Sequence, residues 1–337
     1  MEYRRDRLRR VVLAATTAVT AAALAVTVAP AATAAPGATK APTVKLADRT
    51  AHLTPTAEGG VSTRTAGSGS RSGDFTTDLT PDILARNASN GQLKVYPHSG
   101  AYSGTATFQP GVTINYGWGG MRWIGQGDLT GDGRNDVAYI DAGGVLRLAA
   151  HSGVWDGTNT LLSGEVIGTG WNINDMVFTD DWDADGFDDI LARRAGTGDV
   201  YMYRNSGLGG LSSFQAPLLA ISGPDDDVTL TMGDFTNDAT TDLLFVQSNG
   251  VMGVFNFVTD EMWSIGYGWQ IINAITIADV NLDGVIDVLG RRASDNALLS
   301  YTHTGTWAPN PANGTAYTTL NAPVVIGFNW HINNVIT

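Results

Sequence analysis

The sequence predicts an all-β protein, a five-bladed β-propeller of four-stranded blades whose ring is closed by the C-terminal strand. Acidic segments of nine residues recur at starting positions separated by 54, 53, 53 and 45 residues. A period of about 50 residues with several short strands per unit is typical of propeller blades. No segment after residue 40 sustains a helical apolar period over helical length, which argues against a helical fold.

The first 34 residues predict an export signal. Five arginines precede an apolar run from Val11 to Val28, and the spacing of Ala32 and Ala34 suits cleavage by a signal peptidase. A retained membrane anchor is the alternative, because this run is just long enough to span a bilayer. We expect cleavage near Ala34, which gives a secreted, extracellular protein whose mature chain has no membrane span.

Charge and cysteine content limit the partners and the means of stabilisation. Removal of residues 1–34 takes away five arginines and two acids, so the formal net charge changes from −13 to −16. This charge argues against a nucleic-acid partner, because phosphate binding needs a basic surface. The chain has no cysteine, so stabilisation beyond the core must come from closure of the fold or from metal. We expect a monomer.

Residues 35–73 predict a flexible tether between the signal and the propeller. They contain no Phe, Trp or Tyr, and Ala, Thr, Gly, Ser and Pro dominate the segment. Such a composition buries too little apolar surface to offset the entropy lost on ordering. The propeller itself is expected over residues 74–337.

Each repeat begins with an acidic segment and continues with two strands. The segments read DFTTDLTPD, DLTGDGRND, DWDADGFDD, DFTNDATTD and DVNLDGVID, and they begin at Asp74, Asp128, Asp181, Asp234 and Asp279. An apolar stretch such as DILAR or DVAYI follows each one, and then a Gly or Asn turn and a second stretch such as QLKVYPH. The alternation of apolar and polar residues in these stretches is typical of half-buried strands.

A further strand precedes each acidic segment, and its position predicts how the ring closes. Trp118, Trp171 and Trp269 lie ten residues before the first aspartate of their segments, and Pro224 takes this place in the fourth repeat. The chain ends in VVIGFNWHINNVIT, which repeats this lead-in from Trp330 but stops before an acidic segment, whereas no such lead-in precedes Asp74. We therefore expect the C-terminal strand to complete the first blade, which removes unpaired strand edges.

Residues 74–337 resemble the FG-GAP/VCBS repeat propellers of the secreted bacterial type, whose acidic loop joins the first two strands of each blade. The resemblance is specific in the second, third and fifth segments. It is looser in the first and fourth, where Leu79 and Ala239 stand in the place of the turn glycine. The stretches VIGTGW and SIGYGW are also similar to the five-bladed, tachylectin-type sugar-binding propellers.

The acidic segments predict structural calcium sites, up to five in number, with the second, third and fifth segments the strongest candidates. Oxygens at positions 1, 3, 5 and 9 of each segment match the ligands that calcium prefers, and Gly186 permits the turn around an ion. The alternative is that these residues only form turns. An EF-hand is excluded because Glu is missing at position 12. The expected ligands are Asp74, Thr76, Asp78, Asp82, Asp128, Thr130, Asp132, Asp136, Asp181, Asp183, Asp185, Asp189, Asp234, Thr236, Asp238, Asp242, Asp279, Asn281, Asp283 and Asp287.

The motifs argue against an enzyme. No nucleophile elbow, phosphate-binding glycine loop or histidine-rich metal motif is present. Three of the five histidines, His98, His151 and His303, occupy the same place in their repeats, and Asn205 takes this place in the third. A position shared between blades indicates an architectural role.

The tryptophans Trp118, Trp171, Trp269 and Trp330 suggest a binding function, because an aromatic face beside polar donors can hold a sugar ring. The alternative is that each ring packs between neighbouring blades. We expect a non-catalytic, lectin-like carbohydrate-binding module with an extracellular glycan as its partner. The second function class is an adhesion or protein-interaction scaffold, with a cell-surface protein as its partner.

Overall fold

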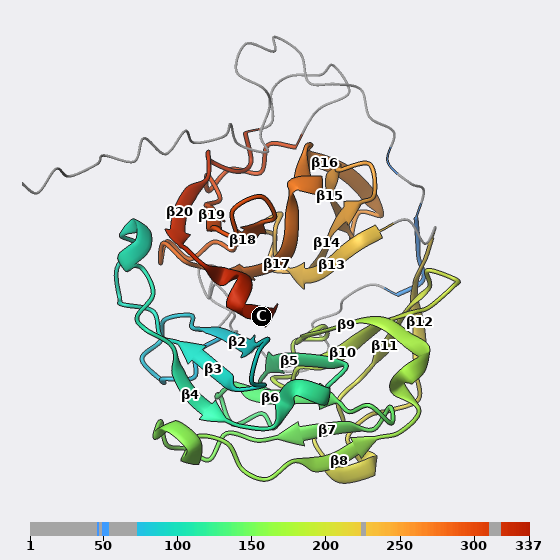
Figure 1. Cartoon of the computed structure of the whole chain (residues 1–337). Helices are drawn as coiled ribbons and strands as arrows, with labels where there is room; N and C mark the ends of the chain where they lie inside the picture. The colour runs from blue at the N-terminus through green and yellow to red at the C-terminus, as the bar shows by residue number, and fades with distance from the viewer. Residues whose placement is uncertain (1–45, 47–48, 54–72, 224–226, 310–317) are drawn as a thin grey trace, which may run out of the picture. The chain divides into compact units, whose positions relative to one another are not determined.

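The computed structural model describes residues 46, 49–53, 73–223, 227–309 and 318–337 (Figure 1). All of these residues belong to one unit, Ala31–Thr337. The export signal predicted at residues 1–34 lies outside the described residues. The described helical turns are short 3-10 turns, and none of the helices among the described residues has the length and apolar character needed to cross a bilayer.

Five antiparallel sheets form the five blades, as the repeats predicted. Blade one contains, in sheet order, β21 (Asn333–Ile336), β2 (Ile83–Asn87), β3 (Leu93–Tyr96) and β4 (Val112–Asn115). Blade two contains β5 (Trp123–Gly127), β6 (Asp136–Ile140), β7 (Leu146–Ala149) and β8 (Glu165–Gly168). Blade three contains β9 (Asn174–Asp180), β10 (Asp189–Arg194), β11 (Val200–Tyr203) and β12 (Leu218–Ser222), with β1 (Thr50–Ala51) as a fifth strand.

Blades four and five continue the same order. Blade four contains β13 (Asp227–Gly233), β14 (Asp242–Gln247), β15 (Met252–Asn256) and β16 (Glu261–Gly266). Blade five contains β17 (Ile272–Ala278), β18 (Asp287–Arg292), β19 (Leu298–Tyr301) and β20 (Val324–Gly327). The 3-10 turns are η1 (Gly104–Ala106), η2 (Trp118–Gly120), η3 (Gly157–Asn159), η4 (Trp171–Ile173), η5 (Gly210–Ser212), η6 (Trp269–Ile271) and η7 (Trp330–Ile332).

The innermost strand of each blade faces a central cavity of about 480 Å³. Residues of β5, β9, β13, β17 and β21 line it. Each of the five clusters of buried apolar side chains found among the described residues combines two neighbouring blades. The core therefore lies between the sheets, and every blade depends on both of its neighbours.

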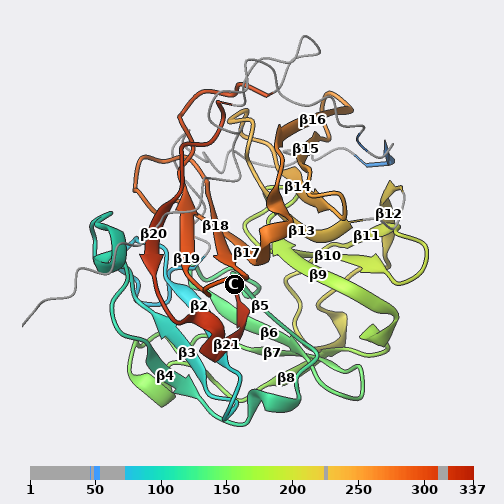
Figure 2. The same ribbon diagram turned by 45° about the horizontal axis from the view of Figure 1, so that its top comes forward.

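The C-terminal strand β21 completes blade one and closes the ring, which confirms the prediction from the missing lead-in. It pairs with β2 in the register Ala85↔Ile336 and Arg86↔Val335. The backbone amides of Leu84 and Thr337 each donate to the carbonyl of the other residue, both at 2.9 Å. Figure 2 shows β21, in red, beside β2, in cyan.

The four tryptophans lie at the junctions between blades. Each ring packs on a tyrosine of the next blade, with ring centroids 4.5 to 4.7 Å apart. The pairs are Trp118–Tyr139, Trp171–Tyr203, Trp269–Tyr301 and Trp330–Tyr96. Their exposed fractions are only 1 to 6%. The rings therefore pack between blades, which is the alternative that the sequence left open.

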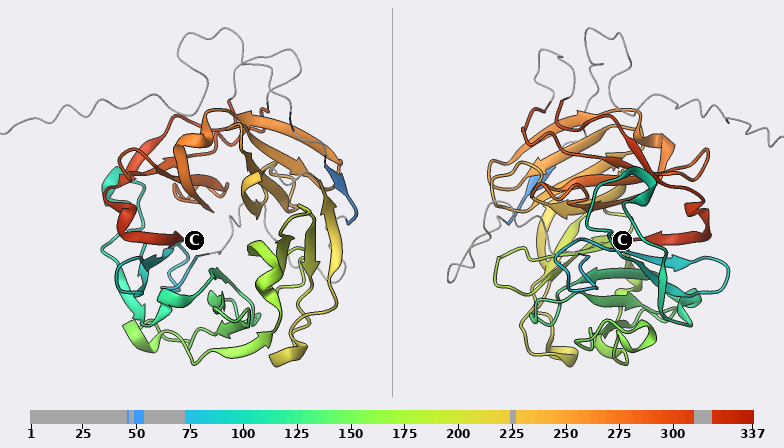
Figure 3. Two further views of the ribbon diagram at one scale, coloured as in Figure 1. Left: turned by 45° about the vertical axis from the view of Figure 1, so that its right-hand side comes forward. Right: turned by 90° about the vertical axis from the view of Figure 1, so that its left-hand side faces the viewer.

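Part of the segment predicted as a flexible tether packs against the propeller instead. β1 extends blade three by pairing with β12, in the register Thr50↔Ser222 (Figure 3). Leu46 and Leu53 contact the core between blades three and four. The tether prediction for residues 35–73 is therefore wrong for these residues. The segment is polar on average, but two leucines that contact the core and two residues that pair with β12 hold this part of it on the propeller.

Arg49 reaches the junction between blades three and four, where Pro224 stands in the sequence in place of the lead-in tryptophan. Its guanidinium donates to both carboxylate oxygens of Asp227, at 2.5 Å to Oδ2, and its Cζ atom lies 4.2 Å from the ring centroid of Phe245. Phe245 is the third residue after the last loop aspartate, as Tyr139 is in blade two. Arg49 therefore covers the aromatic position that a tryptophan covers at the junction between blades one and two.

Candidate metal centre

The acidic segments form the loops between the first and second strands of the blades. In blades two to five each loop runs from the end of the innermost strand to the start of the next strand outward, as between β9 and β10, whereas the first loop leads into β2 and its innermost strand, β21, comes from the other end of the chain. The last aspartate of each loop lies at or next to the start of the second strand. All five loops therefore emerge at equivalent places in their blades.

The five loops share one backbone conformation, even where glycine is missing. Positions 4 and 6 have positive φ throughout. At position 4 these are Thr77 (60°), Gly131 (71°), Ala184 (58°), Asn237 (59°) and Leu282 (62°). At position 6 they are Leu79 (70°), Gly133 (81°), Gly186 (93°), Ala239 (67°) and Gly284 (89°). The first and fourth loops thus adopt the same turn with backbone strain at Leu79 and Ala239.

Replacing Leu79 with glycine is expected to stabilise the protein by about 1 kcal/mol, because a side chain in the left-handed region costs about that amount. The leucine is 73% exposed, so its removal loses little packing. The midpoint of urea unfolding should rise with an unchanged slope. Leu211→Gly is the matched control, since Leu211 is 71% exposed but has a negative φ. Equal gains in both variants would contradict the assignment of strain to Leu79.

Backbone hydrogen bonds orient the loop carboxylates. In the third loop the Asp185 and Gly186 amides donate to the two oxygens of Asp181, at 3.1 and 3.2 Å, and the Phe187 amide donates to Asp185 at 3.0 Å. The first, second, fourth and fifth loops repeat these bonds. The aspartates therefore shape the turn, and the same bonds hold their carboxylates in place for a cation.

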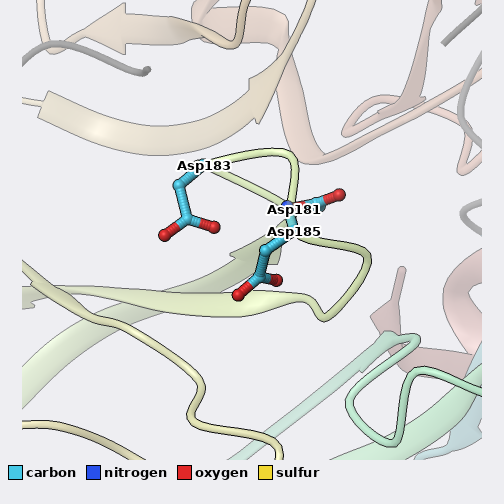
Figure 4. Close-up of side chains that lie close together, drawn as sticks. All are labelled: Asp181, Asp183 and Asp185. Carbon is cyan, nitrogen blue, oxygen red and sulfur yellow. The ribbon is translucent and has the colours of Figure 1, made fainter. Parts of the chain in front are cut away.

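The third loop brings three carboxylates together (Figure 4). One oxygen from each of Asp181, Asp183 and Asp185 lies within 4.8 Å of the other two. Asp183 Oδ1 and Asp189 Oδ2 are buried and form no hydrogen bond to any residue that the structure describes. Buried acceptors without donors are costly unless a cation contacts them. This donor set fits a divalent cation that prefers oxygen ligands.

The last aspartate of every loop has a raised pKa because it is buried. In all five, neighbouring aspartates raise the pKa further, whereas backbone hydrogen bonds lower it. The pKa reaches about 7 for Asp82, about 6 for Asp136, about 8 for Asp189, about 8 for Asp242 and about 7 for Asp287. A bound cation would compete with these protons, so its affinity would increase with pH.

The shared histidine position links neighbouring loops. The His98 amide donates to Asp82 of its own blade at 2.9 Å, and the His98 Nε2 atom lies 3.0 Å from the Val280 carbonyl in the fifth loop. His151 makes the same two contacts, and Asn205 donates through its amide nitrogen to the second loop. These contacts agree with the architectural role expected for this position. The sequence did not predict that the side chain contacts the loop of the preceding blade.

Blade four lacks this polar link. Phe257 stands in the place of the shared histidine and packs on Trp182 of the third loop, with ring centroids 4.4 Å apart. Asp242 Oδ1 also has no hydrogen-bond partner among the described residues, whereas the equivalent oxygen accepts the backbone amide of the shared position in the other four blades. The fourth loop thus differs from the others in its surroundings as well as in its sequence.

Two exposed aromatic side chains stand beside the buried tryptophans and were not predicted as site residues. Tyr116 is 61% exposed and Phe328 is 56% exposed, and each lies two residues before a buried tryptophan, Trp118 or Trp330. The repeat alignment would have identified the position, but alternation alone does not separate the buried aromatic residue from the exposed one.

Comparison with known protein families also identifies a repeat in this chain. A model of FG-GAP-like repeats matches residues 181–245, which run from the third acidic loop into the second strand of blade four. No curated protein matches the sequence of the chain. Residues 181–245 are therefore an FG-GAP-like repeat within a five-bladed β-propeller.

Proposed function

We propose that this protein is a secreted, non-catalytic binding propeller stabilised by calcium ions in its acidic loops. The observation that carries the proposal is the third loop, where clustered carboxylates and buried, unpartnered oxygens share a turn that recurs in every blade. Calcium takes six to eight oxygen ligands and tolerates irregular geometry. Magnesium is less suited, because it demands near-ideal octahedral geometry.

The ligands would come from positions 1, 3, 5 and 9 of a loop. In the third loop these are Asp181, Asp183, Asp185 and Asp189, and the Phe187 carbonyl is a fifth candidate. When bound, calcium would supply positive charge that offsets the repulsion between these carboxylates. The loop ties the innermost strand of a blade to the next strand, so its stability is coupled to the stability of the ring.

Removing calcium is expected to lower the melting temperature by at least several degrees. A single site at 100 times its Kd adds about 2.7 kcal/mol to the free energy of unfolding, and a protein of this size changes its melting temperature by about 2 °C or more per kcal/mol. The measurement compares calcium with a chelator. Asp185→Asn should reduce the response, whereas Asp156→Asn, at an exposed aspartate outside the loops, should not. Equal melting temperatures with calcium and with chelator would remove the metal from the proposal.

A protein partner is the ligand class that we favour. Burial of Trp118, Trp171, Trp269 and Trp330 supports it, because faces packed on tyrosines are not free to stack on sugar rings. Exposed apolar side chains such as Leu79, Leu208 and Leu211 offer contacts of the kind found in protein interfaces.

Carbohydrate binding is the second candidate, and the exposed rings of Tyr116 and Phe328 favour it. A glycan array separates the two ligand classes. Selective binding that Tyr116→Ala and Phe328→Ala both weaken would support the lectin-like function. No binding to any glycan would support the protein-interaction scaffold.

A further inference from the structure

We propose that the fourth acidic loop takes no cation, because the side-chain amide of Asn256 occupies the place of the ion. This inference rests on the proposed calcium function of the other loops. One position controls which loops accept an ion, namely the residue of each blade's third strand that lies opposite the last aspartate of the loop.

Asn256 lies against the atoms that would coordinate a cation. It is the last residue of β15, pairs with Asp242 at the end of the fourth loop, and is only 3% exposed. Its Nδ2 atom donates to Thr236 Oγ1 at 3.1 Å and to Asp238 Oδ2 at 2.8 Å. These acceptors are the side chains at positions 3 and 5, so one amide group bridges two of the expected ligands.

The orientation of this amide is fixed by its other end. Asn256 Oδ1 accepts hydrogen bonds from the backbone amides of Val258 and Thr259, both at 2.9 Å. Rotating the group would place the NH2 against two backbone donors and the oxygen against the Asp238 carboxylate. The two amide hydrogens therefore face the loop and present partial positive charge where a cation would lie.

Thr76 in the first loop shows what the same position is like without the amide. It is the counterpart of Thr236, at position 3 of a loop that also lacks the turn glycine. Thr76 Oγ1 is buried and forms no hydrogen bond within the described part of the chain. Thr236 Oγ1, in contrast, accepts a hydrogen bond from Asn256. At position 3 the first loop therefore has a hydroxyl without an internal partner, whereas the hydroxyl of the fourth loop is engaged by Asn256.

The residue opposite the last loop aspartate differs between the blades. Register places Pro97, Ala150, Arg204, Asn256 and Thr302 at this position in blades one to five. Proline and alanine have no side-chain donor, and the Thr302 hydroxyl accepts from Asn321 and forms no hydrogen bond to the fifth loop within the described residues. Arg204 Nε lies 3.4 Å from Asp183 Oδ2, so its charge offsets part of the charge of the third loop. This position therefore places no donor against the first, second or fifth loop, and in the third loop it lowers the affinity for a cation. Within the second loop the exposed Arg134 pairs with Asp132 at 2.9 Å, and within the fifth loop Asn281 Nδ2 donates to Asp283 Oδ2 at 2.9 Å.

Counting bound calcium on the full chain tests the proposal. Native mass spectrometry with calcium alone, calibrated by calorimetry, should give at most four ions for the wild type. Asn256→Ala should bind one more, because Thr236 and Asp238 lose their internal donor. Arg204→Ala should leave the count unchanged and tighten the weakest of the remaining sites severalfold.

A converse variant keeps the test independent of whether Asn256→Ala folds. Ala150→Asn places an amide at the same position in blade two, and it should bind one ion fewer than the wild type. Five ions in the wild type, or counts unchanged by both Asn256→Ala and Ala150→Asn, would overturn the role of Asn256 and leave the calcium function intact. Absence of calcium from every variant would instead overturn the calcium function itself.

Discussion

A chain without residues 331–337 is expected to lose cooperative unfolding and to aggregate. The deletion removes β21, which buries Ile336 and supplies the pairing partners of β2. Ile83, Leu84 and Ala85 of β2 are almost fully buried in the intact protein, so the deletion would expose an apolar edge strand. The free energy lost with these contacts is large compared with a typical free energy of unfolding of about 5–15 kcal/mol. Circular dichroism melts and light scattering measure the two effects.

Adding the missing strand back provides the control. A synthetic peptide of residues 318–337 should restore part of the cooperative transition, because an extended peptide can add to an open sheet edge. A scrambled peptide of the same composition should not restore it. If the shortened chain melted like the full one, the ring would not depend on β21.

Replacing Trp118 with alanine is expected to reduce the free energy of unfolding by about 3–5 kcal/mol, the usual cost of removing a buried aromatic side chain. The ring lies between blades one and two, with its centroid 4.5 Å from that of Tyr139. Tyr116→Ala is the matched control, since it removes an exposed aromatic side chain from the same loop. Urea unfolding of both variants measures the difference.

The two variants together distinguish packing from ligand binding. Tyr116→Ala should unfold within about 0.5 kcal/mol of the wild type, as exposed substitutions usually do. A wild-type stability for Trp118→Ala, combined with a loss of glycan binding, would show that this ring serves a ligand instead of the junction.

The fold could be predicted because both the strands and the loops recur in the sequence. The spacing of the aspartate segments defined the blades, and the unpaired lead-in at Trp330 defined the closure. The docking of β1 could not be predicted, because an average over residues 35–73 hides the few side chains that matter. Leu46, Arg49 and Leu53 gain their contacts from blades three and four, far away in the sequence.

The site was predictable at the level of the loops and less so at the level of single residues. The alternating aspartates predicted the turn and the cluster at Asp181, Asp183 and Asp185. The burial of the tryptophans depends on the tyrosines of the next blade, which the sequence does not pair with them. The contact of Asn256 depends on the register between β14 and β15, and one residue of slip would remove it.

The closure of the ring also sets the order in which the protein can finish folding during synthesis. Blades two, four and five are each contiguous in the chain, so each can assemble once its own strands have been made. Blade one contains the earliest of the repeat strands but needs β21, the last strand of the chain, and β1 needs blade three. Bringing β21 to β2, and β1 to blade three, costs conformational entropy, and this entropy is lost before the new contacts stabilise the fold. The blade that is begun first is therefore the last to be completed.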